Sequence, residues 1–233
     1  MNPGKTVVIR KPRGWRGESP APSRGFFVPA SQARAGAIAV IPARYASTRL
    51  PAKALADIGG MPMVARVLAR ARLAERVGRV VVATDDERIR AAVAASGEVV
   101  MTSALHTSGS DRVAEVAAAS DCEIVVNVQG DLPLLDPRWI DLLVERMTSD
   151  PTIGMATVAV PVRSREELLD PNAVKVVCDS SGRALYFSRA PIPFHRDDPD
   201  GFGGTLHHVG LYAYRRATLL RFAALAPARS GVR

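Results

Sequence analysis

Three cations and a hydroxyl gather in one short stretch of the chain. Arg44, Ser47, Arg49 and Lys53 follow a run of apolar residues at positions 37–41. Such a run, ending at a proline, predicts a buried strand, and open α/β sheets bind ligands beyond the carboxyl ends of their strands. Arginine offers a planar fork to phosphate oxygens and lysine a point charge. The stretch therefore predicts a polyanion site, most simply for a nucleoside triphosphate; a solvated basic loop is the alternative.

This predicted phosphate loop lacks the two common glycine-rich phosphate motifs. The sequence has no Gly-x4-Gly-Lys-Ser/Thr, and Gly-x-Gly-x-x-Gly is missing after the first predicted strand. A triphosphate held without a glycine-rich backbone cradle needs side-chain cations. The absence of both motifs supports the phosphate role of Arg44, Arg49 and Lys53.

A carboxylate follows a second apolar run, at positions 124–128. Gln129, Gly130 and Asp131 come directly after this predicted central strand. In a parallel sheet Asp131 would lie at the same edge as the cations, and Gly130 would allow close backbone approach. Mg²⁺ usually takes one or two carboxylates plus phosphate oxygens, so Asp131 is the predicted metal ligand. The alternative, a helix cap, is filled better by Asp136.

A weaker signal precedes a helix predicted from about Asp111. His106, Ser108 and Gly109 are residues that can bind an anion or a base edge at a helix N-terminus. Ordinary helix capping explains the same residue types.

The second half of the chain carries polar groups on predicted strands. Arg189 is a candidate clamp for a carboxylate, and His208 and Tyr212 are candidates to orient hydroxyls. A structural role for a histidine in a strand is an equal alternative.

Apolar runs and helical spacings along residues 37–153 predict alternating strands and helices. Strands are expected at 79–84, 98–101 and 124–128, with helices after Pro62, Asp86, Asp111 and Asp136. This order predicts an α/β fold with a Rossmann-like, mostly parallel sheet covered on both faces. After about Ile153 the strand-like segments have little helix between them, which predicts a smaller mixed-strand substrate subdomain.

Charge is distributed unevenly along the 233 residues. Residues 1–36 hold seven basic residues and one acidic residue, whereas the remainder holds 24 and 22. The net charge of +8 therefore belongs mainly to the first segment, which we expect to be a disordered basic tail before a domain spanning 37–233. No nucleic-acid surface, membrane insertion or secretory signal is indicated. Cys122 and Cys178 suit small buried thiols in a cytoplasmic protein.

Several motifs together resemble the 3-deoxy-manno-octulosonate cytidylyltransferases, or CMP-Kdo synthetases, from about residue 37 to about residue 226. The first-half motifs alone would suggest only a sugar nucleotidyltransferase, whereas those of the second half are similar to this family in particular. They are PARYASTRLPAK at 42–53, ATDD at 83–86, HTSGSDR at 106–112, NVQGD at 127–131, NAVKVV at 172–177, LYFSRAPIP at 185–193 and HVGLYAYR at 208–215.

The resemblance implies a nucleotide-diphospho-sugar transferase type of fold and transfer of CMP from CTP to 3-deoxy-D-manno-octulosonate (Kdo). Pyrophosphate would leave after Mg²⁺-dependent in-line attack on the α-phosphorus, and the product would feed lipopolysaccharide synthesis. The implied nucleotide-binding residues are Ala43, Arg44, Ser47, Arg49, Lys53, His106, Ser108, Gly109 and Gln129. Arg49, Lys53 and Asp131 would be catalytic, with Asp131 on the metal, and Arg189, His208 and Tyr212 would bind Kdo.

The sequence departs from the family pattern in two places. Leu132 stands where the family usually has Glu. The family also continues with a helix-rich segment of its homodimer and a GVDTPEDL-like stretch that carries a second Mg²⁺-binding Asp; no match occurs here, so we interpret the chain as C-terminally incomplete. Two alternatives stay open: a catalytically impaired CTP- and Kdo-binding remnant, or a cytidylyltransferase for another acidic sugar.

Overall fold

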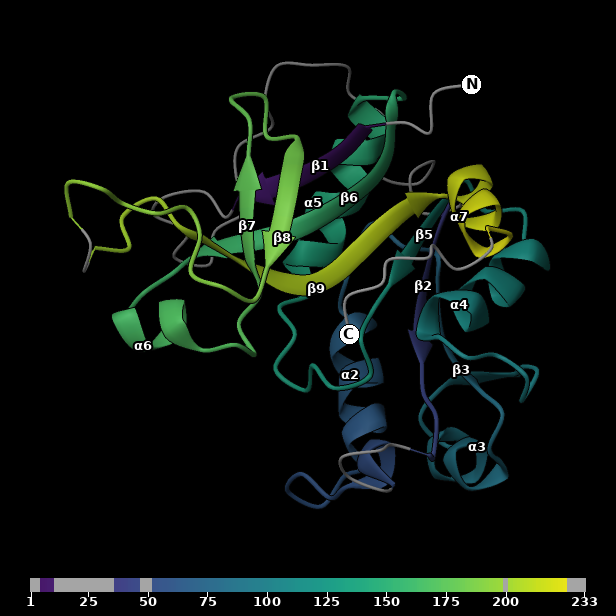
Figure 1. The fold of residues 1–233 in the computed structure, drawn as a ribbon. Coiled ribbons are helices and arrows are strands. Elements are labelled where there is room, and N and C mark those ends of the chain that lie inside the picture. The colour runs from purple at the N-terminus through teal and green to yellow at the C-terminus, as the bar shows by residue number, and fades with distance from the viewer. Residues whose placement is uncertain (1–4, 11–35, 47–51, 199–200, 226–233) are drawn as a thin grey trace.

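A single sheet forms the centre of the computed structural model, which describes residues 5–10, 36–46, 52–198 and 201–225 (Figure 1). The strands are β1 (Lys5–Arg10), β2 (Ala37–Pro42), β3 (Arg79–Thr84), β4 (Glu98–Met101), β5 (Ile124–Asn127), β6 (Ile153–Pro161), β7 (Lys175–Cys178), β8 (Ala184–Ser188) and β9 (Leu206–Arg215). The helices are η1 (a 3-10 turn, Lys53–Leu55), α2 (Met63–Ala71), α3 (Glu87–Val93), α4 (Gly109–Ala118), α5 (Arg138–Ser149), α6 (Arg165–Leu169) and α7 (Arg216–Ala223).

The first half of the sheet is parallel, as its unbroken apolar strands predict. Strand β2 pairs with β3 on one side and with β5 on the other, and β4 extends the sheet from β3. The carboxyl ends of β2 and β5 are therefore neighbours at one sheet edge. This pairing confirms the premise on which Asp131 was placed beside the cationic loop.

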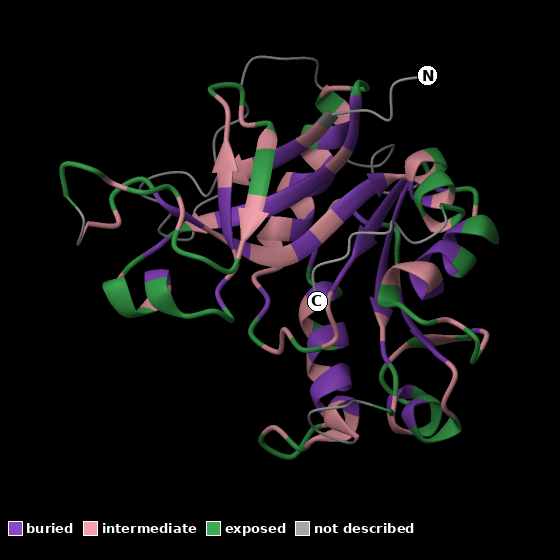
Figure 2. Ribbon diagram, in the orientation of Figure 1, coloured by how far each residue is buried: buried purple, intermediate pink, exposed green. Residues whose placement is uncertain are grey.

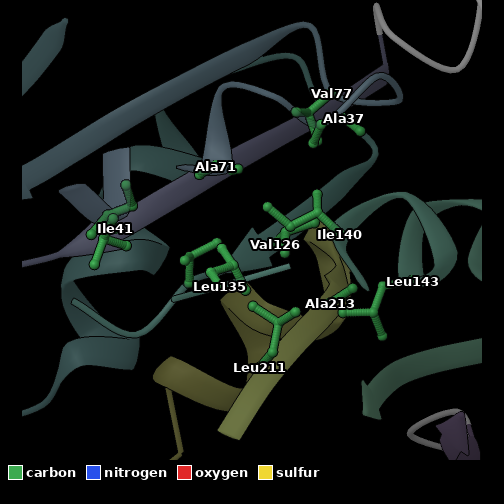
Figure 3. Close-up of a cluster of buried hydrophobic side chains, with 14 of the residues drawn as sticks. Ala37, Ile41, Ala71, Val77, Val126, Leu135, Ile140, Leu143, Leu211 and Ala213 are labelled. Carbon is green, nitrogen blue, oxygen red and sulfur yellow. The ribbon is translucent and has the colours of Figure 1, made fainter. Parts of the chain in front are cut away.

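Helices cover both faces of this half of the sheet. One face packs on the apolar sides of α2 and α5, where alternate strand residues such as Ile41 and Val126 meet Ala71 and Ile140 (Figure 3). The other face packs on α4 and α7, with Val125 and Val113 in its core. The predicted inner sides of α2 and α5 are fully buried, so the helical spacing of apolar residues is confirmed.

Strand β9 joins the second half of the chain to the first. It runs antiparallel between β5 and β6, and β7 with β8 branches from its beginning. Figure 1 shows the β7–β8 hairpin and α6 at one end of the molecule, away from β3 and α3. The mixed-strand addition is thus confirmed, and it shares the sheet of the first half.

The expectation of a disordered tail over residues 1–36 is wrong for residues 5–10. These form β1, which pairs in parallel with β6 at the sheet edge. Val7 and Val8 are buried there, so these apolar residues form a strand despite the Pro- and Arg-rich sequence around them. The strand was not predicted because its partner β6 is distant in sequence, and a local pattern does not show such pairing.

Helix starts differ slightly from those expected. Asp86 caps α3 by accepting from Arg88 N, as predicted. Helix α4 begins earlier, at Gly109, with Ser108 as its cap. Asp136 accepts from Arg138 N at 3.1 Å, although α5 itself begins one residue beyond Pro137.

Burial follows the sheet, and exposed residues lie on the outer loops, on the outer sides of the helices and on β8 (Figure 2). Cys122 is buried and Cys178 half-buried, and neither forms a disulfide. Within the described part of the chain, no helix is long and apolar enough to cross a membrane.

Candidate active site

A cavity of about 190 Å³ opens beyond the carboxyl ends of β2 and β5. Its lining residues are Pro42, Ala43, Arg44, His106, Thr107, Ser108, Gly109, Arg112 and Gln129. The cavity thus collects Ala43, Arg44, His106, Ser108, Gly109 and Gln129, which were predicted to bind the nucleotide. A larger hollow of about 580 Å³ beside α6 is lined by none of the predicted site residues. We therefore take the smaller cavity as the candidate site because of the residues that line it, and not because of its size.

Glycines allow the loops around this cavity to approach one another. A Cβ on Gly130 would lie 3.0 Å from the backbone oxygen of Pro42, and one on Gly109 would lie 3.4 Å from Pro42 Cγ. A Cβ on Gly210 of β9 would lie 3.9 Å from Gln129 Cγ. The predicted close approach at Gly130 is therefore present, and it fixes the loop after β5 against the end of β2.

The start of α4 forms one wall of the cavity. Ser108 accepts from Asp111 N and the Asp111 carboxylate accepts from Ser108 N, which makes a capping box. His106 Nε2 contacts the carboxylate of Glu115, which also accepts from Ser103 N. The bond from Ser103, with that from His106, holds the Glu115 pKa below its ordinary value. His106 is thereby held in place by a carboxylate that stays ionised.

Lys53 and Asp131, distant in sequence, meet as an ion pair. Lys53 Nζ lies 2.5 Å from Asp131 Oδ2, and both side chains are almost half exposed. Ala52, just before Lys53, adopts a left-handed conformation with φ of 58°. Its amide donates to Tyr45 O at 3.1 Å, which holds η1 close to the loop that carries Arg44.

Arg44 is exposed and has no ion-pair partner among the described residues. A guanidinium in that state keeps its charge available to an anion in the adjoining cavity. The predicted Ser47 and Arg49 lie outside the described residues.

Leu132, the residue that departs from the family pattern, packs against the main hydrophobic cluster. Its amide donates to Gln129 O in a turn. An apolar side chain at this position therefore stabilises the loop that carries Asp131.

Two arginines were not identified from the sequence. Arg112 lines the cavity although only 3% of it is exposed; its Nη2 lies 3.1 Å from Asp85 Oδ1, and its Nη1 contacts the Thr102 hydroxyl. Arg88 places its guanidinium 3.3 Å from the centre of the Tyr45 ring, which anchors the loop after β2 to α3. In the sequence, Arg112 could have been noticed as a charged residue among the apolar residues of α4, because a buried charge needs a partner.

The candidate sugar-binding residues His208 and Tyr212 lie together on β9. Their ring centroids are 5.0 Å apart, and the Phe187 ring of β8 meets His208 edge-on at 5.2 Å. Burial lowers the pKa of His208 from 6.5 to about 4 and raises that of Tyr212. Both side chains are therefore neutral hydrogen-bonding groups at neutral pH. Phe187 was not singled out from the sequence.

Arg189 makes its hydrogen bond to a different segment, the turn before β7. Its Nη1 donates to Pro171 O at 2.6 Å, while the fully buried Lys175 donates to Asp170 O and Ala173 O in the same turn. Arg189 thus holds the turn before β7, and its remaining N–H groups are the ones that a carboxylate would use.

The residues around Asp131 suit a hard cation that also binds phosphate. Asp131 is an exposed carboxylate two residues from Gln129 in the cavity wall. No group of three or more His, Cys, Asp or Glu side chains suited to a metal occurs among the described residues. One carboxylate with substrate phosphate oxygens is the arrangement typical of Mg²⁺, so the donor set fits this ion.

Comparison with known proteins gives the same assignment. Residues 38–229 match the family model described as Cytidylyltransferase. Two proteins named 3-deoxy-manno-octulosonate cytidylyltransferase, from Geobacter metallireducens and Geobacter sulfurreducens, are 52% and 50% identical over 199 residues, covering 81% of this chain and 78% and 80% of theirs. A solved structure of CMP:2-keto-3-deoxy-manno-octonic acid synthetase in complex with CTP aligns with a TM-score of 0.77 at 43% identity, covering 83% of this chain and 79% of that one.

The match to the family model extends through both halves of the sheet, because residues 38–229 run from β2 through β9. The chain therefore belongs to the cytidylyltransferase family and, within it, to the 3-deoxy-manno-octulosonate cytidylyltransferases.

Proposed function

We propose that this protein transfers CMP from CTP to Kdo, giving CMP-Kdo and pyrophosphate for lipopolysaccharide synthesis. The observation that carries the proposal is the cavity beyond β2 and β5, whose lining includes six of the nine predicted nucleotide-binding residues, from three separate segments. Relatives about half identical in sequence bear the name of this activity, and a similar solved structure is a complex with CTP.

The nucleotide would lie with its phosphates toward the cationic side of this cavity. Arg44 would bind phosphate oxygens, with Ser47 and Arg49 of the same loop and with Lys53. The N-terminal amides of α4 offer hydrogen bonds beside Ser108 and Gly109, where we place the cytidine with His106 and Gln129. Arg112 also lines this cavity, but because its charge is balanced by Asp85, it would shape the wall rather than add net positive potential.

The sugar would lie between the loop after β5 and the aromatic face of β9. Gly210 next to Gln129 brings these two segments together. His208 and Tyr212 would orient hydroxyls of Kdo, and Arg189 would hold its carboxylate. The anomeric oxygen would then attack the α-phosphorus, forming the new P–O bond as pyrophosphate leaves and the hydroxyl proton is lost. Positioning and charge neutralisation would supply most of the rate enhancement.

We propose Mg²⁺ as the cofactor, held by Asp131 together with phosphate oxygens of CTP. The ion would neutralise the phosphate charge that builds up on the leaving group. Lys53, now paired with Asp131, would be released toward the phosphates when the carboxylate takes the metal. A surface ion pair contributes only about 0.2–1 kcal/mol, so this exchange requires little free energy.

The proposal is tested by incubating the full chain with CTP, Kdo and Mg²⁺, and by measuring pyrophosphate release and CMP-Kdo by mass spectrometry. We expect product with CTP and Kdo, and far less with UTP or with N-acetylneuraminate. Efficient use of another acidic sugar would reassign the substrate. Retained CTP binding without turnover would favour a binding remnant, and no CTP binding would contradict the assignment altogether.

We also propose a cytoplasmic location, supported by the reduced state of Cys122 and Cys178, neither of which forms a disulfide. Assembly into the family's homodimer stays a prediction, which light scattering on the full chain would test.

A further inference from the structure

Thr157 of β6 determines which nitrogen of His208 carries the proton. Thr157 Oγ1 lies 2.6 Å from Leu211 O and 2.9 Å from His208 Nε2. The carbonyl can only accept, so the hydroxyl proton is committed to Leu211 O and the hydroxyl oxygen can only accept from the ring. His208 must therefore carry its proton on Nε2.

A β-bulge creates this geometry. Ala159 of β6 pairs with His208, but Thr157 pairs with Tyr212, so β9 has two extra residues between the paired positions. Gly210, with φ of 83°, occupies the bulge. Leu211 lies in the shifted segment and has no register partner in β6, and its carbonyl oxygen accepts from the Thr157 hydroxyl.

The other ring nitrogen, Nδ1, is an unprotonated acceptor. Burial holds the His208 pKa at about 4, so the ring is neutral near pH 7 and carries one proton. Among the described residues, His208 makes its hydrogen bond through Nε2 to Thr157, and Nδ1 has no partner. Phe187 and Tyr212 contact the ring as aromatic neighbours, which leaves the Nδ1 lone pair for a ligand.

We infer that Thr157 is a positioning residue: it fixes His208 in the Nε2–H tautomer, so that Nδ1 accepts a hydrogen bond from a hydroxyl of the sugar substrate. This inference rests on the proposed function for the identity of that sugar. The inference also specifies a property of the substrate: the group that faces Nδ1 of His208 must be a hydrogen-bond donor.

The tautomer can be measured directly by ¹⁵N NMR of the histidine ring in the full chain, with His208→Gln identifying the signal. The wild type and Thr157→Ser, which keeps the hydroxyl, should show a protonated Nε2 and a bare Nδ1 near pH 7. Thr157→Val, which has a similar shape but no hydroxyl, should lose this preference. A proton on Nδ1 in the wild type would overturn the inference even if the valine variant fails to fold.

Kinetics test the consequence for binding. Thr157→Val should raise the KM for Kdo about 3- to 10-fold, the equivalent of one hydrogen bond, with the KM for CTP unchanged and Thr157→Ser close to the wild type. Equal KM values for Kdo in the valine and serine variants would contradict the positioning role. Absence of CMP-Kdo formation by the wild type would instead contradict the proposed function, and the NMR result would still decide the tautomer.

Discussion

The two sides of the candidate site differ in how they hold their functional groups. Beyond β2 and β5, the groups are charged, open to solvent and carried on loops or a short 3-10 turn: Arg44 has no ion-pair partner among the described residues, and Lys53 and Asp131 form a pair that is almost half exposed. On β9, His208 and Tyr212 are neutral and largely buried within a strand. The first side suits attraction of a polyanion, and the second suits orientation of hydroxyls.

This difference follows from the two substrates proposed for the site. A triphosphate brings several negative charges, which solvent-exposed cationic side chains can attract and neutralise. A sugar hydroxyl is recognised by hydrogen bonds, whose selectivity depends on fixed and fully partnered groups. Substitutions on the loops should therefore affect CTP and turnover, and substitutions on β9 should affect Kdo.

The largest effect is expected from Asp131→Asn. The neutral amide is a poorer ligand for a hard cation and leaves Lys53 without its carboxylate, so turnover should fall roughly 100-fold or more. Pyrophosphate release at saturating substrates measures this loss. Asp136→Asn is the matched control, because Asp136 caps α5 outside the cavity and should change stability rather than turnover. Equal turnover in the two variants would contradict the role of Asp131.

Arg44→Ala should come next. Loss of a charged hydrogen-bond donor to phosphate should raise the KM for CTP about 10- to 100-fold, with little change in the KM for Kdo. Arg221→Ala, an exposed arginine on α7, controls for the loss of one positive charge. Comparable KM values for CTP in the two variants would remove Arg44 from the phosphate site.

Gly130→Ala should disturb the junction of the two loops. The added Cβ would meet Pro42 O at 3.0 Å, and relief of such an overlap typically costs about 1–3 kcal/mol of stability. Urea unfolding measures this cost, and CTP affinity should fall with it. Gly203→Ala, where nothing lies within 4 Å, should shift stability by less than about 1 kcal/mol. Wild-type stability and CTP binding in the Gly130 variant would contradict the close packing.

The smallest effect concerns pH and the β9 side. Burial lowers the folded-state pKa of His208 from 6.5 to about 4, so between these values the unfolded chain binds the extra proton and stability falls as pH falls. The His208 contribution lost from about pH 7 to about pH 5.5 is about 1 kcal/mol. Urea unfolding at both pH values should show this loss in the wild type and a correspondingly smaller one in His208→Gln. An identical loss in both would mean that His208 is not the titrating group.

The sequence predicts the loop side of the site better than the strand side. The apolar runs, prolines and helix caps around Arg44 and Asp131 are local patterns, and the parallel sheet then places both residues at one edge. Thr157 has no such signal, because its role depends on a bulge in a strand more than 50 positions away. The same reason explains β1, whose partner β6 is distant in sequence. Side-chain contacts across a sheet depend on the register between two strands, which the sequence of one short segment does not determine.

The division of the site into a charged nucleotide side and a neutral sugar side is tested most directly by measuring both KM values in Arg44→Ala and His208→Gln, with CMP-Kdo as the product followed. Arg44→Ala should raise the KM for CTP and leave that for Kdo near the wild-type value, and His208→Gln should do the reverse. An increase of the same KM in both variants, or of neither, would contradict the division.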